Sequence, residues 1–344
     1  MSRIRRIGTL GVTCAALIVS MVIGTTAASA RPRAEVLLSG LSSPKALTID
    51  TNGNPIVGQG AFGPPGPILE YVLGGPNRGT TIQLFDATNV VDIAVASDDS
   101  AWAIGGDRRL YRADTSGNIV MVLNIPRYQR SDPDPVDQAD DAAESNPYGL
   151  TVLPDGDALV ADAANNDLLR VTAGGDVTTV ARFDVEEIGP DDLTAEAVPT
   201  TVTLGPDGMA YVGELKGFPF TPETSHVWRI DPDADGAFCS LDTSDPDCSV
   251  YADGFTAIQD MAFNPNNGRL YVYELAAEGV LAFEEGFGTG HFPPAVLLKV
   301  KKHTRVELAA GRLSEPGGIA VAHDGTVFVT DGMFSDGRLL RIRG

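Results

Sequence analysis

Residues 149–171 read GLTVLPDGDALVADAANNDLLRV and contain three short apolar runs separated by two turns. The first turn is centred on Asp155-Gly156 and the second on Asn165-Asn166, and both dipeptides favour tight reversals of the chain. Runs this short are typical of β-strands rather than helices. The stretch therefore predicts three antiparallel strands, and residues 177–183 supply a fourth.

The same block recurs six times. The first apolar runs start at Ala46, Asp92, Gly149, Thr201, Asp260 and Gly318, spaced 46, 57, 52, 59 and 58 residues apart. A long repeat built only of short β-type runs and Gly/Asp turns is typical of a propeller blade. We therefore predict an all-β fold, a six-bladed β-propeller of four-stranded blades.

The sixth copy ends after its third strand. Its missing outer strand is expected at the N-terminal side, because residues 36–44 (VLLSGLSSP) echo residues 306–316 (VELAAGRLSEP) of the fifth copy. We expect this N-terminal strand to complete the last blade and close the ring, which removes an exposed sheet edge. Residues 31–344 are then a single propeller domain.

Residues 1–30 have the pattern of a signal peptide. Three arginines precede a mostly apolar stretch at 7–23, and Ala28-Ser29-Ala30 is a small-residue cleavage signal. We predict a secreted protein, with an uncleaved anchor as the alternative. No later apolar segment is long enough to span a membrane.

The chain after residue 30 keeps 22 basic and 46 acidic residues, a formal net charge of −24. This charge repels nucleic acid and anionic lipid, and it argues against both as partners. It also keeps a secreted protein dispersed, so we expect a monomer; a cation-collecting surface is the alternative. Cys239 and Cys248 remain after cleavage and predict a disulfide, since a metal or redox pair would lack a nearby histidine.

Propeller loops sort onto two faces. The Asp-Gly turns mark one face, here called the plain face, and the long insertions lie on the opposite one, here called the insertion face. The insertions are residues 127–145, 183–199, 215–225 and 276–294. Insertions gathered on one side of a repeat array commonly mark the binding side.

The residues that end the second strands are expected on the insertion face. They are Gln59, Gly105, Asp162, Glu214, Glu274 and Asp331. The four carboxylates are expected to ring the channel mouth, where they would bind a divalent cation or serve as general acid and base. The alternative is that each accepts backbone N–H groups in its own turn. Glu144, Asn146 and Asp260 lie at blade entries on this face and are candidates to join the cluster.

Aromatic residues also gather in these insertions. They are Tyr148, Phe218, Phe220, Phe287, Phe292 and Phe334. Aromatic rings on rigid Gly/Pro turns suit a planar or apolar ligand. The alternative is that they pack down as lids over the blades.

An acidic loop in the fourth blade resembles a calcium loop. Asp231, Asp233 and Asp235 occupy loop positions one, three and five, Gly236 follows, and Asp242 stands at position twelve. No helix is expected beside it, so it is no EF-hand. The loop either binds Ca²⁺, which would order it, or is an ordinary Asp-rich turn.

Histidine is scarce, with four in the chain and only His291 on the insertion face. A His-rich zinc site or a Ser-His-Asp triad has little to build from, and neither a Gly-x-Ser-x-Gly elbow nor a phosphate-binding glycine motif is present.

Several stretches resemble the ScyD/ScyE family of exported propeller proteins. They are NPYGL at 146–150, LLRV at 168–171, VPTTV at 198–202 and GELKGFPF at 213–220. The family is named from gene clusters for scytonemin, an aromatic pigment. The resemblance implies an exported propeller without defined catalytic residues, and it does not imply pigment synthesis here.

Two functions remain open from the sequence. The first is a secreted binding or scaffold propeller for a small molecule or cell-surface component, using Tyr148, Glu214, Phe218 and Phe220. The second is a Ca²⁺-dependent hydrolase, similar to lactonase-type or esterase-type propellers, with Asp162, Glu214, Glu274 and Asp331 around a metal in the channel. A quinone-dependent sugar dehydrogenase is disfavoured, because the expected histidine and arginine residues are missing.

Overall fold

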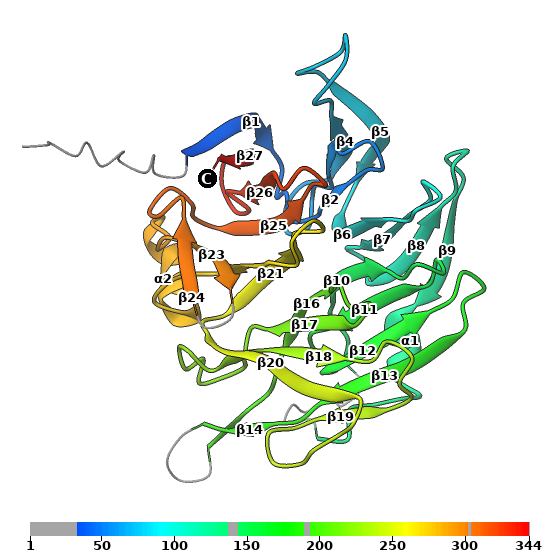
Figure 1. The fold of residues 1–344 in the computed structure, drawn as a ribbon, viewed down its shortest axis with the longest axis vertical. Helices are drawn as coiled ribbons and strands as arrows, with labels where there is room; N and C mark the ends of the chain where they lie inside the picture. Colours follow the sequence, from blue (N-terminus) through cyan, green and yellow to red (C-terminus); the bar gives the residue numbers. More distant parts are fainter. Residues whose placement is uncertain (1–32, 137–143, 189–192, 302–303, 344) are drawn as a thin grey trace, which may run out of the picture. The chain divides into compact units, whose positions relative to one another are not determined.

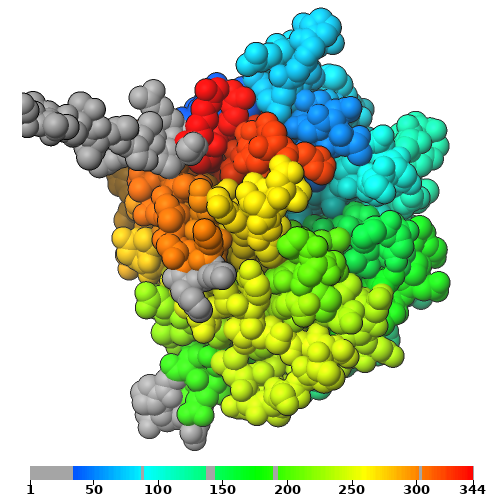
Figure 2. Space-filling view, viewed as in Figure 1, coloured from blue at the N-terminus to red at the C-terminus, as the bar shows by residue number. Residues whose placement is uncertain are grey.

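The computed structural model describes residues 33–343 except 137–143, 189–192 and 302–303. The predicted signal peptide, residues 1–30, lies outside the described residues. The described chain forms six blades of four antiparallel strands each, which follow one another around a ring (Figure 1). In the space-filling view the colours run around the molecule in sequence order (Figure 2). The prediction of a six-bladed β-propeller is confirmed.

The first three blades follow the repeat. Blade 1 contains β2 (Leu47–Ile49), β3 (Pro55–Val57), β4 (Gly66–Tyr71) and β5 (Thr81–Thr88). Blade 2 contains β6 (Val90–Val95), β7 (Ala101–Gly105), β8 (Arg109–Ala113) and β9 (Ile119–Asn124). Blade 3 contains β10 (Pro147–Val152), β11 (Ala158–Asp162), β12 (Asp167–Val171) and β13 (Val177–Phe183).

The last three blades complete the ring. Blade 4 contains β16 (Pro199–Leu204), β17 (Ala210–Glu214), β18 (Ser225–Ile230) and β20 (Cys248–Phe255). Blade 5 contains β21 (Ile258–Phe263), β22 (Leu270–Glu274), β23 (Val296–Lys301) and β24 (Thr304–Leu308). Blade 6 contains β25 (Pro316–Val321), β26 (Val327–Asp331), β27 (Gly337–Arg343) and β1 (Arg33–Leu41).

The closing strand comes from the N-terminal side, as predicted. β1 pairs antiparallel with β27, with Glu35 opposite Arg341 (Figure 1). The carboxylate of Glu35 also accepts from the guanidinium of Arg341 at 2.8 Å. Because β27 is paired along its length, the last sheet presents β1 rather than an unfinished blade.

The core lies between neighbouring blades. Strand residues alternate, so that in β11 Val160 packs toward blade 2 while Leu159 packs toward blade 4, and both are fully buried. Each such side chain stabilises the fold by about 1.5–3 kcal/mol relative to an exposed one. The turns between first and second strands need a left-handed residue, which Gly156 supplies in blade 3 with a φ of 95°.

Several connecting loops hold structure that the repeat does not predict. β14 (Glu186–Glu187) and β15 (Thr194–Ala195) form a two-stranded sheet, and β19 (Ala237–Cys239) pairs in parallel with β13 of blade 3. Two helices are present, α1 (Ile125–Gln129) and α2 (Val280–Thr289). In the described part of the chain, no helix is long and apolar enough to cross a membrane.

Candidate functional site

Two aspartates face the central channel from opposite blades. Asp92 of blade 2 and Asp260 of blade 5 begin equivalent inner-strand runs, and each accepts from a backbone N–H of the next blade. Leu150 N lies 2.8 Å from Asp92, and Ile319 N lies 2.8 Å from Asp260. The acceptors therefore tie neighbouring inner strands together. Both aspartates line a cavity of about 220 Å³ in the central channel.

These aspartates are not ordinary carboxylates. Burial raises the pKa of Asp92 to about 7; the Lys45 charge opposes this shift, and Asp260 adds to it. Burial likewise raises the pKa of Asp260. The Lys45 ammonium is the counter-charge that both acids share, and it is 3% exposed.

Tyr148 lies on the insertion-face side of these aspartates. Its ring lies 3.9 Å below the Lys45 ammonium, which also donates to the Tyr148 carbonyl at 2.8 Å. Across the channel, the amide of Gln259 donates to the Tyr148 hydroxyl at 2.9 Å. Burial raises the pKa of Tyr148, so the hydroxyl stays neutral. Lys45, Tyr148 and Gln259 together connect three blades at the insertion-face end of the channel.

An exposed group of aromatic rings extends outward from Tyr148. We call Phe62, Tyr148, Phe287, Phe292 and Phe334 the aromatic patch. Ring centroids are 6.2 Å apart for Phe62 and Tyr148, 5.5 Å for Phe62 and Phe334, and 4.9 Å for Phe287 and Phe334. Phe62, Phe287 and Phe334 remain 50%, 59% and 37% exposed. The patch combines four chain segments into one apolar surface.

Helix α2 anchors the patch. Its buried Phe283 packs against Phe292 with centroids 4.8 Å apart, while Phe287 projects to the surface. Gly286 makes this approach possible, because a Cβ there would lie 2.4 Å from the Phe292 ring. Phe283 and Phe292 thus pack down onto the protein, whereas Phe287 faces solvent.

Phe218 and Phe220 form a neighbouring pair. Their centroids are 6.1 Å apart; Phe220 packs against the small apolar cluster beneath α2, and Phe218 is 66% exposed. Among the described residues, neither ring of this pair is in ring–ring contact with the aromatic patch. Phe220 therefore supports α2, and Phe218 offers further apolar surface.

The four predicted carboxylates do not meet in the channel. Asp162, Glu274 and Asp331 are each buried and accept from a backbone N–H at the entry of their own blade. Their donors are Asn146 N at 2.6 Å, Thr256 N at 2.8 Å and Ser314 N at 2.8 Å. Gln59 accepts from Ser42 N in the same way at 2.7 Å. These carboxylates therefore have the alternative role considered from the sequence, in which each accepts hydrogen bonds from backbone N–H groups of its own blade.

Burial sets the acidity of these groups. It raises the pKa of Glu274 to about 7 and also raises the pKa of Asp162 and Asp331. Asp331 also receives the guanidinium of Arg338 and the hydroxyl of Tyr273. Hydrogen bonds within each blade therefore use the oxygens that a shared metal would need.

Glu214 belongs to a different buried network. Its carboxylate accepts from the indole N–H of Trp228 and lies 2.9 Å from the ammonium of Lys216, which is 2% exposed. Burial alone would raise the pKa of Glu214, but Lys216 and His226 outweigh it and leave the pKa lowered. The ionised carboxylate therefore compensates a buried lysine.

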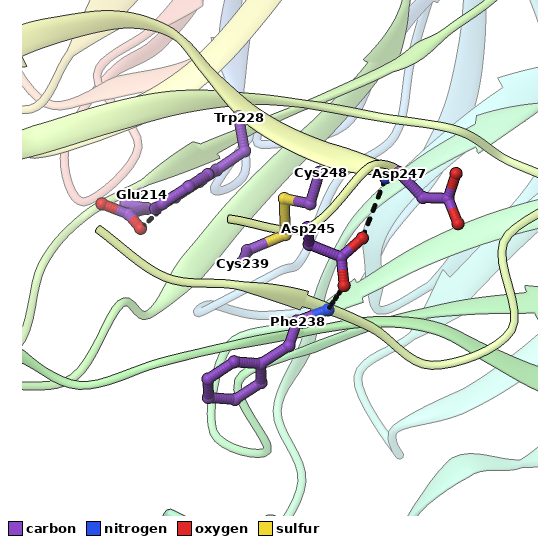
Figure 3. Close-up of a disulfide and its surroundings, with 7 residues drawn as sticks. All are labelled: Glu214, Trp228, Phe238, Cys239, Asp245, Asp247 and Cys248. Carbon is purple, nitrogen blue, oxygen red and sulfur yellow. Dashed lines mark hydrogen bonds between the residues drawn. A yellow bond between two sulfur atoms is a disulfide. The ribbon is translucent and has the colours of Figure 1, made fainter. Parts of the chain in front are cut away.

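The disulfide between Cys239 and Cys248 is confirmed (Figure 3). Beside it, Asp245 accepts from the N–H groups of Phe238 at 2.9 Å and Asp247 at 2.8 Å. The bridge starts inside the predicted calcium loop, at Cys239, and links β19 to β20 of blade 4.

The calcium loop does not present a cation site. Asp233 is paired with Arg170 of blade 3, and Asp231 accepts from the Asp233 N–H at 3.0 Å. Asp235 and Asp242 are exposed. Within the described ranges, no three His, Cys, Asp or Glu side chains lie close enough to hold a metal ion.

Sequence reasoning missed four of the residues that matter here. Lys45, Phe62, Asp92 and Gln259 belong to no recognisable motif. A signal existed for Asp92 and Asp260, since aligned inner strands carry Ala46, Gly149, Thr201 and Gly318 at the same position. Only blades 2 and 5 carry an acidic residue at this position, and this departure from the repeat is visible in the sequence.

No family model and no curated protein matches the chain. Among solved structures, virginiamycin B lyase from Staphylococcus aureus is 14% identical over 90% of this chain and 85% of that one, with a TM-score of 0.51. The PQQ-bound aldose sugar dehydrogenase from Streptomyces coelicolor is 14% identical over 91% and 98%, with a TM-score of 0.56. The soluble aldose sugar dehydrogenase from Escherichia coli is 14% identical over 90% and 99%, with a TM-score of 0.54. At such low identity these similarities show the β-propeller fold alone.

Proposed function

We propose that this chain is an exported ligand-binding propeller, which binds a planar or apolar surface at the aromatic patch. The ligand is a small molecule or a cell-surface component with that chemistry. The observation that carries the proposal is the exposure of Phe62, Phe287 and Phe334. They are 50%, 59% and 37% exposed, although Phe334 contacts both of the other rings. Contiguous exposed apolar surface on a secreted protein favours an interaction site.

The geometry of the patch supports this assignment. Its rings come from a rigid β3–β4 loop, an inner strand, a helix and the β26–β27 turn, so they are ordered before a ligand arrives. Rings held in advance lose little conformational freedom on binding, which favours affinity. The buried Lys45 ammonium already lies over Tyr148 and would not be available to a ligand.

The hydrolase alternative gains no support from these contacts. Asp162, Glu274 and Asp331 are bonded within separate blades, and Glu214 is paired with Lys216. The resemblance to the ScyD/ScyE family stays a prediction.

The proposal is tested with N-phenyl-1-naphthylamine, an uncharged planar fluorophore, titrated into the chain from residue 31. Saturable binding is expected, and the Phe287→Ala/Phe334→Ala variant should bind at least tenfold more weakly. Two stacked rings contribute roughly 0.5–1.5 kcal/mol each beyond their buried area, and about 1.4 kcal/mol is tenfold in affinity.

The matched control is Tyr251→Ala, which removes an exposed ring from the outer strand of blade 4. Its affinity should equal that of the unmodified chain. Equal affinity in the Phe287→Ala/Phe334→Ala variant would overturn the proposal.

A further inference from the structure

A cavity between blades 1 and 2 shares no lining residue with the aromatic patch, although its Ala61 is the chain neighbour of Phe62. It measures about 560 Å³, and its walls include Ile68 and Phe85 of blade 1 and Ala103 and Ala113 of blade 2. A second cavity of about 320 Å³ shares Phe85 and Ala113 with it. The two therefore form one cleft between the sheets.

The cleft follows from side chains that are smaller in blade 2 than elsewhere. Ala103 pairs with Ile93 of the first strand, and this register position is valine in every other blade. The valines are Val57, Val160, Val212, Val272 and Val329. Blade 2 alone lacks the two methyl groups that would fill the space.

The neighbouring strand repeats the pattern. Ala113 pairs with Ala101, and the equivalent residues in blades 3 to 6 are larger. They are Val171, Ile230, Val300 and Ile342. Gly105 likewise stands where the other blades carry Gln59, Asp162, Glu214, Glu274 and Asp331. The Asp107 carboxylate and the Tyr111 ring occupy the space beside Gly105. The cleft therefore follows from the two truncations at Ala103 and Ala113, which lie on the sheet face directed at blade 1.

The space is too large for a packing defect. Protein interiors rarely hold voids larger than a water molecule, whereas small-molecule pockets span roughly 300–1,000 Å³. Phe85, Val95 and Ala103 along the gap are only partly buried, in contrast to the fully buried interface of blades 3 and 4. At the outer edge Leu84 and Ile119 are 37% and 51% exposed. The cleft is thus open and apolar.

Its polar groups are restricted to the ends. Near the insertion face lies Asp107, which receives the Tyr111 hydroxyl at 2.7 Å. At the plain-face end the lining includes Asp50, Glu70 and Asp114. The walls between carry no charge to pair with a ligand. The plain-face end is acidic, and at the insertion-face end Asp107 is ion-paired with Arg109 at 3.2 Å. An anionic head group is therefore disfavoured.

We propose that this interblade cleft binds a single extended apolar chain, of alkyl or isoprenoid type, with an uncharged polar end group. The site goes beyond the aromatic patch and shares none of its residues. The chain lies between the two sheets, and its end group lies beside Asp107 and Asn89. Occupation covers the apolar surface that Ala103 and Ala113 leave open.

The test is calorimetric titration of the chain from residue 31 with decan-1-ol. Saturable binding is expected in the unmodified protein and in Phe287→Ala/Phe334→Ala. The Ala103→Val/Ala113→Val variant restores the side chains of the other blades, and it should bind at least tenfold more weakly. Decanoate, of the same chain length, should also bind at least tenfold more weakly than decan-1-ol.

The valine variant is checked for folding by its melting temperature, which should equal or exceed that of the unmodified chain; if it does not fold, Ala103→Val alone takes its place. The proposal is overturned if decan-1-ol fails to bind, or if it binds a folded valine variant with unchanged affinity. Equal affinity for decanoate would overturn the assignment of an uncharged end. Loss of naphthylamine binding in Phe287→Ala/Phe334→Ala with decan-1-ol binding retained would separate the two sites.

Discussion

Asp92 shows how one side chain links stability to pH. It accepts from Ile93 N at 2.9 Å and Leu150 N at 2.8 Å, so it joins blades 2 and 3 at the channel. Burial raises its pKa from 3.8 to about 7, so the folded chain holds a proton that the unfolded chain has lost. Between about pH 4 and pH 7 this residue therefore lowers the free energy of unfolding as pH rises.

Asp92→Asn removes that proton uptake. The difference in melting temperature, variant minus unmodified chain, should rise from pH 4 to pH 7 and level off above it. Thermal unfolding followed by circular dichroism at several pH values measures the trend. Asp176→Asn, which removes an exposed carboxylate from a turn, is the charge-matched control and should show no such rise. A constant difference for Asp92→Asn would contradict the assignment.

Single residues also mark the limit of sequence reasoning. Tyr148 was predicted as a surface aromatic, yet its hydroxyl and carbonyl bind Gln259 and Lys45 across the channel. Partners that are 103 and 111 residues away cannot be read from local pattern. The sequence indicated the Tyr148 ring but not the Lys45 ammonium that lies over it.

At the scale of elements, β19 ties blade 4 to blade 3. It leaves the β18–β20 loop, pairs with β13 and is linked to β20 by Cys239–Cys248. The sequence predicted the disulfide from cysteine count, but not this pairing. Three residues, Ala237–Cys239, are too short to show a strand pattern of their own.

Cys239→Ser/Cys248→Ser should destabilise the protein by roughly 2–4 kcal/mol, because closing a short loop no longer restricts the unfolded chain. The amides of Ala237–Cys239 should lose protection in hydrogen exchange, while β13 stays protected by β12. The unmodified chain under reducing conditions is the control and should behave as the variant does. Unchanged protection of residues 237–239 in both would refute a clamping role.

The four-strand repeat was predictable because each blade must bury two faces with alternating side chains. Helix α2 was not, since its Phe283 and Phe287 lie in an insertion outside the repeat. The carboxylate rim failed as a converging site for a related reason. Equivalent positions in separate blades repeat the same local hydrogen bond, seen at Asp162 and Asp331, rather than pointing at one centre.

At the scale of the whole molecule, closure by β1 holds the ring together. β1 covers β27, and Leu41 is buried in the cluster between blades 6 and 1. Without it, β27 would present an unpaired edge, which favours aggregation.

A chain that starts at residue 42 should therefore unfold at lower temperature and aggregate, whereas a chain that starts at residue 32 should keep the full melting temperature. Scanning calorimetry with light scattering measures both. Equal stability of the two chains would show that closure by β1 is dispensable.

A crystal structure with N-phenyl-1-naphthylamine would show whether this propeller binds its ligand at the aromatic patch. Electron density for the fluorophore is expected against Phe287 and Phe334, with Phe62 at its edge. A fluorophore bound elsewhere, with these rings still facing solvent, would contradict this expectation.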